Sequence, residues 1–358
     1  MMENGISLYP GLDNTLAENL QLIEDAAACG IRRIFTSLHI PETDADVLKK
    51  ELAIILAVAR EREMEIISDI SPRTLEMLDM QEFSLTAFKE LGIGTLRLDY
   101  GYETSQIAEL SHNELGIRLQ LNASTITEQI LAELQAAGTD FSHIDALHNF
   151  YPRKGTGLSE KALCRKNALL KAAGIKVGAF VPSHGRQRGP LFEGLPTLEA
   201  HRLWQTDRAA RHLAALGIDS VFLSDSLPLP EEMQAVGSLR ADEVVVEAKL
   251  WTDDAVQRKL LQHHFTARED EARDAIRAQE SRGLLQGTIA PENNKERRRG
   301  AITLDNQDYL RYMGELQIVK KSQPADKRVN VAGQIAECEL FMLKYITPGR
   351  KFSFKLLD

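Results

Sequence analysis

The chain has 358 residues and a formal net charge of −9, from 43 basic and 52 acidic residues. This balance argues against a protein whose main partner is nucleic acid or an anionic membrane. Three widely spaced cysteines, Cys29, Cys164 and Cys338, indicate free thiols in a reducing compartment rather than a metal site. The sequence shows neither a secretion signal nor an apolar run of transmembrane length, so we expect a cytoplasmic protein.

Strand-like and helix-like segments alternate regularly from residue 5 to about residue 226. The helix-like segments carry apolar residues at i, i+3 and i+4, and several end on a glycine just before the next strand. The eight strand-like runs are 5–11, 32–38, 65–71, 95–101, 117–124, 143–150, 176–183 and 220–226. This pattern predicts an α/β fold of the (β/α)8 TIM-barrel type. A doubly wound open sheet is the alternative, but the first turn, YPGLDNT, lacks the glycine fingerprint of a dinucleotide site.

The regular alternation of strand-like and helix-like segments ends at about residue 235. Short strand-like runs follow at 243–251, 287–290, 300–305, 316–322 and 352–358, with one helix-like stretch at 253–280. We therefore predict a TIM-barrel catalytic domain at 1–235 and a small, mainly β domain at 236–358.

Almost every predicted barrel strand ends on a polar residue. The catalytic groups of such barrels lie at the carboxyl ends of the strands, and polar groups over an apolar core are costly unless they are used. The polar residues at these ends are Tyr9, Ser37, His39, Asp69, Arg97, Asp99, Gln120, Asn122, His148, Asn149, Ser183 and Asp225.

One stretch, TLRLDYGY at 95–102, shows how these side chains are directed. Alternation places Leu96 and Leu98 toward the helices, with Arg97 and Asp99 toward the barrel axis. For Arg97, an internal salt bridge and a functional role are both open. For Asp99, at the strand end, we favour a functional role.

Four carboxylates are candidate catalytic groups. Glycoside hydrolysis requires two carboxyl groups that flank the scissile bond. We rank Asp99 and Asp225 first, then Asp69 and Glu193, the last in the loop after the seventh strand. The acidic residues form no tight cluster, so we predict neither a metal nor another cofactor.

The most function-like stretch is LHNFYPRKGTGLSE at 147–160. His148, Asn149 and, on an earlier strand, Asn122 suit the recognition of sugar hydroxyls. Tyr151 and Arg153 precede a Gly155-Thr156-Gly157 loop, whose backbone N–H groups favour an anion. An ordinary surface loop is the alternative here, as it is for the basic run KERRRG at 295–300.

Several motifs together resemble the MupG family of bacterial 6-phospho-N-acetylmuramidases. They occur in the family's order along nearly the whole chain: ISLYPG, DISP, LRLDYG, LNAST, HNFYPR with TGLS, RGPLFEGLPTLEAHR and RRRGAITLDNQDYLRYMGELQI. The resemblance implies a TIM barrel followed by a cyclophilin-like β domain. It also implies hydrolysis of the disaccharide N-acetylmuramic acid 6-phosphate–N-acetylglucosamine during peptidoglycan recycling.

Such a substrate carries a phosphate and a lactyl carboxylate, which implies arginine contacts. Arg153, Arg188 and the RRRG run are the candidates. Arg299, Asn306, Tyr309 and Arg311 in the late motif would add to the same pocket, or would only join the two domains.

Two other functions compete with the glycosidase. A lyase or aldolase acting on a phosphosugar would want a Schiff-base lysine or a metal set at a strand end, and no predicted strand ends in lysine. A phosphosugar sensor or a peptidyl-prolyl isomerase-like scaffold would bind without turnover, but an anion receptor would avoid a mouth lined with carboxylates.

Overall fold

The structure is a computed structural model that describes residues 2–37, 45–70, 74, 82–98 and 101–357. The chain divides into two compact units, Met1–Ala241 and Asp242–Asp358. Each unit is described below by itself.

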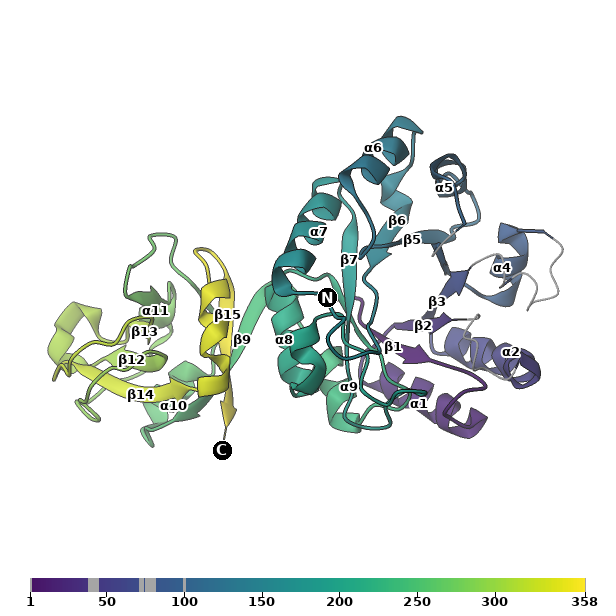
Figure 1. The fold of residues 1–358 in the computed structure, drawn as a ribbon. Helices are drawn as coiled ribbons and strands as arrows, with labels where there is room; N and C mark the ends of the chain where they lie inside the picture. The colour runs from purple at the N-terminus through teal and green to yellow at the C-terminus, as the bar shows by residue number, and fades with distance from the viewer. Residues whose placement is uncertain (1, 38–44, 71–73, 75–81, 99–100, 358) are drawn as a thin grey trace. The chain divides into compact units, whose positions relative to one another are not determined.

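The first unit is a closed barrel of eight parallel strands, which confirms the predicted fold class (Figure 1). Each strand pairs with the next, and β1 pairs with β8 to close the sheet, with Gly5 opposite Phe222. The strands are β1 (Gly5–Leu8), β2 (Arg33–Ser37), β3 (Glu65–Ile70), β4 (Thr95–Leu98), β5 (Arg118–Asn122), β6 (Ile144–Leu147), β7 (Lys176–Val181) and β8 (Ser220–Leu223).

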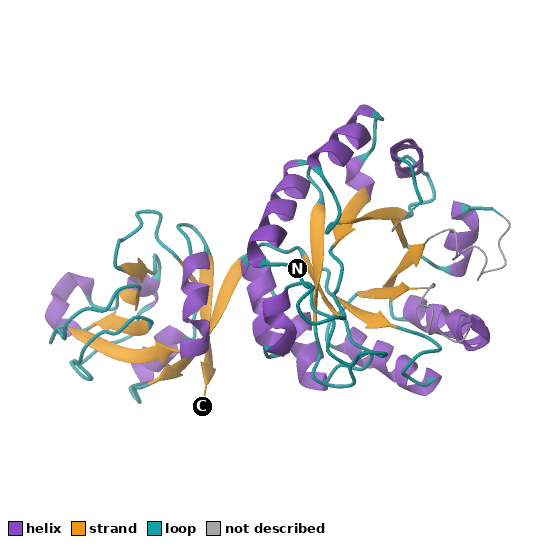
Figure 2. Ribbon diagram, in the orientation of Figure 1, coloured by secondary structure: helices purple, strands orange, loops and turns teal. Residues whose placement is uncertain are grey.

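Helices form a ring around the barrel strands (Figure 2). They are α1 (Leu16–Ala28), α2 (Ala45–Glu61), α4 (Leu85–Leu91), α5 (Thr104–Ser111), α6 (Glu128–Ala136), α7 (Glu160–Ala172), α8 (Thr206–Ala215) and α9 (Pro230–Gly237), with 3₁₀ turns η1 (Phe141–His143) and η2 (Glu199–Leu203). Local sequence sets their limits. For example, Thr15 and Glu18 form a capping box at the start of α1. Gly92, with φ of 91°, ends α4 in the left-handed conformation that glycine favours.

The barrel strands bury both faces, as a parallel sheet must. Outward residues such as Leu96 and Leu98 join the large core formed with the helices. The inward residues form layers. At the amino ends of the strands, Arg33 binds Glu65 and Asp145, each at 2.8 Å. Above this ionic layer, Phe35, Phe180 and Phe222 belong to an apolar cluster. The polar strand ends lie above that cluster, so the interior is a packed core with its chemistry at one end.

The second unit is a seven-stranded sheet with the strand order β10-β15-β9-β14-β12-β13-β11. Its strands are β9 (Glu243–Leu250), β10 (Phe265–Thr266), β11 (Ala275–Arg277), β12 (Ala301–Asp305), β13 (Leu316–Val319), β14 (Val329–Ile335) and β15 (Lys351–Leu357). Helices α10 (Ala255–Leu261) and α11 (Ser281–Leu284), with 3₁₀ turns η3 (Gln307–Tyr312) and η4 (Glu337–Tyr345), complete it. The mainly β character agrees with the prediction.

The predicted helix at 253–280 is wrong beyond Leu261. The chain leaves α10 there, and Phe265 pairs with Phe352 of β15. Ala275–Arg277 then form β11 against β13. These pairings with distant strands override a helical pattern that is strong only locally. The predicted strand at 287–290 is also absent, and β14 was not predicted.

Candidate active site at the carboxyl ends of the barrel strands

Aromatic rings lie under the polar strand ends of the first unit. Phe35, Phe150 and Phe180 pack edge to face, with ring centroids 5.1 to 6.1 Å apart. Tyr9 belongs to the same cluster, and its buried hydroxyl donates a hydrogen bond of 2.7 Å to the carbonyl of Ser224. Burial raises the pKa of Tyr9 to about 12. The floor of the candidate site is therefore apolar and stays neutral at physiological pH.

Arg97 connects three strands at this level. Its guanidinium donates to the carboxylate of Asp69 and to the side-chain oxygen of Asn149, each at 2.6 Å. Its Cζ lies 6.0 Å from the centroid of the Phe35 ring. Arg97 thus faces the axis, as alternation predicted, and of the two open interpretations the internal salt bridge is present. Asp69 and Asn149 are therefore brought together by this contact.

Arg188 lies over the aromatic floor. Its Cζ is 4.9 Å from the ring centroids of both Tyr9 and Phe150, within the range of a cation–π interaction. Its Nε is buried and has no hydrogen-bond partner among the described residues. Apart from a contact with the Tyr9 hydroxyl, this guanidinium is held by ring faces, which leaves donors available for an anion.

Asp225 is completely buried beneath the loop that carries Arg188. Its carboxylate accepts backbone N–H bonds from Ser183 at 2.8 Å and from Arg188 at 3.1 Å, and a further one from Leu195. Burial raises its pKa to about 6, although these donors act in the opposite direction. Both carboxylate oxygens are thus occupied in holding the loop after β7.

Asp13, in the loop after β1, was not predicted. Its carboxylate accepts a 2.6 Å bond from the hydroxyl of Ser226 and a 3.0 Å bond from the N–H of Gly189. The sequence did carry a signal, because Asp13 follows the polar strand end at Tyr9 by four residues.

The Gly155-Thr156-Gly157 loop already binds an anion, and that anion is a side chain of the protein. The carboxylate of Glu199 accepts the N–H of Gly155 at 2.9 Å and that of Gly157 at 2.8 Å. Hydrogen bonding to Arg202 is the main reason that the pKa of Glu199 falls to about 2. The predicted use of these N–H groups for a substrate anion is therefore wrong, because a permanent carboxylate occupies them.

Arg202 joins the two loops around this contact, and it too was missed. Its buried guanidinium binds both oxygens of Glu199, at 2.7 and 2.8 Å. It also donates to backbone carbonyls on both loops, namely those of Tyr151, Pro152, Arg153, Glu193 and Gly194. Only a planar five-donor group can satisfy so many acceptors at once.

The loop residues predicted to contact substrate or to act in catalysis differ in their exposure and in their ion pairs. Arg153 is exposed, and Tyr151 is half-buried beside Arg202. Glu193 forms an ion pair of 3.2 Å with Lys154, and hydrogen bonding to Lys154 lowers the pKa of its carboxyl. A carboxylate in that state does not suit a general acid.

His148 points away from the barrel axis. Its buried ring lies 2.9 Å from the side-chain oxygen of Asn167 on α7 and 3.1 Å from the hydroxyl of Ser124. Burial lowers its pKa to about 4. Its neighbour Asn149 takes the opposite face and binds Arg97, as alternation requires. We therefore leave His148 out of the proposed contacts with substrate.

Asn122 ends β5 and is buried, and its side-chain oxygen accepts the N–H of Ser124 at 3.1 Å. Asp99 and His39 lie outside the described residues. No group of three or more histidine, cysteine, aspartate or glutamate side chains suited to a metal ion occurs among the residues that the structure describes.

The four predicted residues of the second unit differ in their surroundings. Asn306 is buried, and its amide donates to the carbonyl of Lys327 and to Asn330, each at 2.9 Å. Arg299 and Arg311 are exposed, and Tyr309 is half-buried with the guanidinium of Arg328 4.4 Å from its ring centroid. Asn306 thus shapes its own unit.

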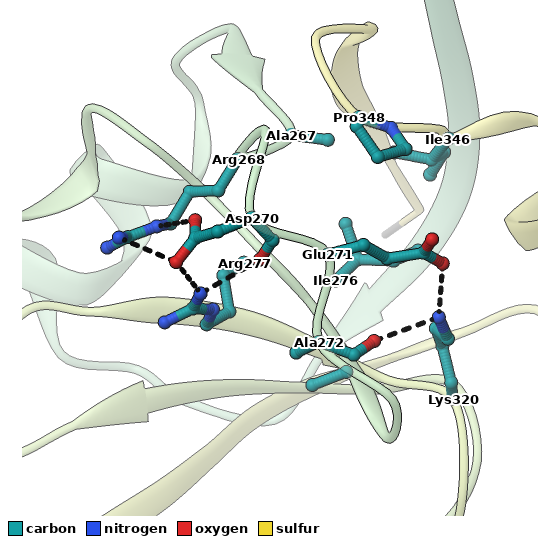
Figure 3. Close-up of a pocket in the computed structure, with 11 residues that line it drawn as sticks. Ala267, Arg268, Asp270, Glu271, Ala272, Ile276, Arg277, Lys320, Ile346 and Pro348 are labelled. Carbon is teal, nitrogen blue, oxygen red and sulfur yellow. Dashed lines mark hydrogen bonds and ion pairs between the residues drawn. The ribbon is translucent and has the colours of Figure 1, made fainter.

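In a small pocket of the second unit, every charged side chain of the lining has an oppositely charged partner (Figure 3). Asp270 binds both Arg268 and Arg277, and Lys320 binds Glu271 at 2.9 Å. The cavity of about 20 Å³ holds a water-sized group at most. It is therefore not the site of a sugar.

Comparison with known proteins agrees with the division of the chain. Residues 4–238 match the family model described as 6-phospho-N-acetylmuramidase, N-terminal. Residues 244–355 match the model described as 6-phospho-N-acetylmuramidase, C-terminal. A search of curated proteins gave no match.

Two crystal structures of uncharacterised proteins are similar over the whole chain. One, from B. cereus, is 30% identical with a TM-score of 0.86, covering 100% of this chain and 99% of that one. The other, a conserved protein of unknown function from Enterococcus faecalis, is 34% identical with a TM-score of 0.71, covering 99% and 96%. Among the described residues, no helix is long and apolar enough to cross a membrane. The chain belongs to the 6-phospho-N-acetylmuramidase family, a family of glycosidases by name.

Proposed function

We propose that the chain hydrolyses the bond between N-acetylmuramic acid 6-phosphate and N-acetylglucosamine, as a cytoplasmic step of peptidoglycan recycling. The observation that carries this proposal is Arg188. Its guanidinium lies over the Tyr9 and Phe150 rings, and its Nε has no hydrogen-bond partner among the described residues. A sugar ring with a phosphate and a lactyl carboxylate supplies the missing acceptors.

The reacting carboxyl groups are assigned to Asp69 and Asp99. Asp69 ends β3 beside Arg97, and Asp99 follows β4, the next strand of the barrel. One acts as the acid that protonates the leaving oxygen, and the other as base or nucleophile. Arg97 binds the Asp69 carboxylate, and Asn149 accepts a second bond from the same guanidinium and so helps to hold it in place.

Asp225 receives a positioning role in this proposal. Its three backbone contacts fix the loop from Ser183 to Leu195 and thereby the position of Arg188. A carboxylate whose oxygens are directed at amides inside the protein is poorly placed to reach a glycosidic oxygen. Asp225→Asn should therefore raise KM more than it lowers kcat.

The test compares the phosphorylated and unphosphorylated disaccharides without added metal, by release of N-acetylglucosamine. We expect release from the phosphorylated substrate alone. Asp69→Asn and Asp99→Asn should lower kcat by roughly 100-fold or more, the usual contribution of acid–base catalysis. Arg188→Gln should raise KM by about 10- to 100-fold, since it removes a charged hydrogen-bond donor.

Arg62→Gln is the matched control, because Arg62 is an exposed arginine whose partner is Glu24. Its kinetics should equal those of the wild type. Tight binding of the phosphorylated disaccharide without any release would contradict hydrolysis and favour the phosphosugar sensor.

A further inference from the structure

Phe192 is a large apolar side chain left in solvent on a well-held loop. It is 57% exposed, and its neighbour Leu191 is 48% exposed. The backbone of Phe192 has a φ of 51°, a left-handed conformation that costs a bulky residue about 1 kcal/mol or more. More than half of this side chain stays exposed in a strained conformation, so it contributes little to the fold for its size, which points to a function.

The loop around Phe192 is braced on both sides. Asp13 accepts the N–H of Gly189 at 3.0 Å, and Asp225 accepts that of Arg188. Arg202 donates to the carbonyls of Glu193 and Gly194, at 3.2 and 2.9 Å. The exposure of Phe192 is therefore a property of a fixed loop.

Phe192 also belongs to the same turn as Arg188. Its N–H donates to the carbonyl of Arg188 at 3.2 Å. Its ring lies over Gly189, where a Cβ would stand 3.2 Å from the ring atom Cζ. Arg188 and Phe192 are thus presented by one turn, the first as a cation and the second as an apolar face.

We propose that Phe192, assisted by Leu191, forms the subsite for the leaving N-acetylhexosamine ring. This inference rests on the proposed function. The leaving ring carries neither phosphate nor carboxylate, so it needs no arginine. The axial C–H bonds of a pyranose form an apolar face that suits the negative face of an aromatic ring. A rigid aromatic residue binds such a face at little cost in conformational entropy.

Product inhibition separates this subsite from that of the phosphosugar. Phe192→Ala should weaken inhibition by free N-acetylglucosamine by roughly 2- to 13-fold, the usual range of an aromatic contact. Inhibition by N-acetylmuramic acid 6-phosphate should not change. Phe192→Trp should restore inhibition by N-acetylglucosamine.

Leu203→Ala is the matched control, because Leu203 is 82% exposed and has no place in the proposed site. Both inhibition constants should equal those of the wild type. An equal weakening of both inhibitors by Phe192→Ala would show a general role in the loop and overturn the subsite. Unchanged inhibition by N-acetylglucosamine would overturn it as well.

Failure of the proposed function would be visible separately, as a wild-type protein that releases no N-acetylglucosamine. The subsite is then tested by titrating Phe192→Trp with N-acetylglucosamine and following tryptophan emission, with Leu203→Trp as reference. A saturable change confined to Phe192→Trp supports the subsite. No change, or the same change in both variants, overturns it.

Discussion

Two buried histidines of the barrel make the stability of the fold sensitive to acid. Burial lowers the pKa of His148 from 6.5 to about 4, and that of His201 well below its usual range. The unfolded chain then binds these protons more readily, so their contribution to stability is present above about pH 6.5 and is lost as the pH falls. For His148 the loss amounts to about 3 kcal/mol between pH 6.5 and pH 4.

Comparison of variants separates the histidine contribution to the pH dependence of stability from that of Asp225. The raised pKa of Asp225, about 6, changes the free energy of unfolding with pH in the opposite direction. Asp225 stabilises the fold below its unfolded pKa, and this contribution is lost as the pH rises through 6. His148→Gln should reduce the fall in the free energy of unfolding between pH 7 and pH 4.5, as measured by urea titration. His143→Gln, at an exposed position, should leave the curve unchanged. Parallel curves for His148→Gln and the wild type would contradict the assignment.

At the scale of elements, one side chain joins the loops after β6 and β7. Arg202 is buried and binds Glu199 and backbone carbonyls of both loops. Arg202→Lys keeps the charge but cannot reach so many acceptors, so buried carbonyls lose their donors. We expect a loss of about 2 to 4 kcal/mol in the free energy of unfolding, with faster proteolysis between residues 151 and 199.

Arg268→Lys in the second unit is the control, because Arg268 pairs with the exposed Asp270. Its loss should stay within about 0.5 kcal/mol, as for other surface ion pairs. Equal losses in the two variants would show that the loops do not depend on Arg202.

At the scale of the whole molecule, each unit has its own fully buried aromatic side chains. Phe88 belongs to the core of the first unit, and Phe352 pairs with Phe265 in the second. We propose that the units Met1–Ala241 and Asp242–Asp358 unfold as separate cooperative transitions. Phe88→Ala and Phe352→Ala should each lower one transition and spare the other.

Calorimetry of the two variants tests this proposal. Each substitution removes a completely buried ring, at a cost of about 3 to 5 kcal/mol. One transition that both variants lower alike would mean that the chain unfolds as a single unit.

The candidate site was predictable from the sequence only in part. The direction of Arg97 followed from alternation, because a strand has a fixed period of two. The same rule shows that His148 and Asn149 cannot both face the axis. In the structure it is Asn149 that faces the axis. The roles of Arg202 and Glu199 could not be predicted from the sequence, since their partners lie up to 51 residues away along the chain.

The sequence by itself determined the barrel and the β-rich second unit. Strand alternation, helical spacing and glycine stops are local properties, and eight repeats of them leave few ways to bury both faces of a parallel sheet. The tertiary structure alone decided what each charged side chain binds: Arg97 binds Asp69, Asp225 binds the backbone of the Arg188 loop, and Glu199 binds the backbone of the glycine loop. The first contact depends on the register of β3 against β4, and the other two form across loops whose paths depend on the closure of the whole sheet. The same reason explains the error at 253–280, where pairing with β15 and β13 overrode a local helical pattern.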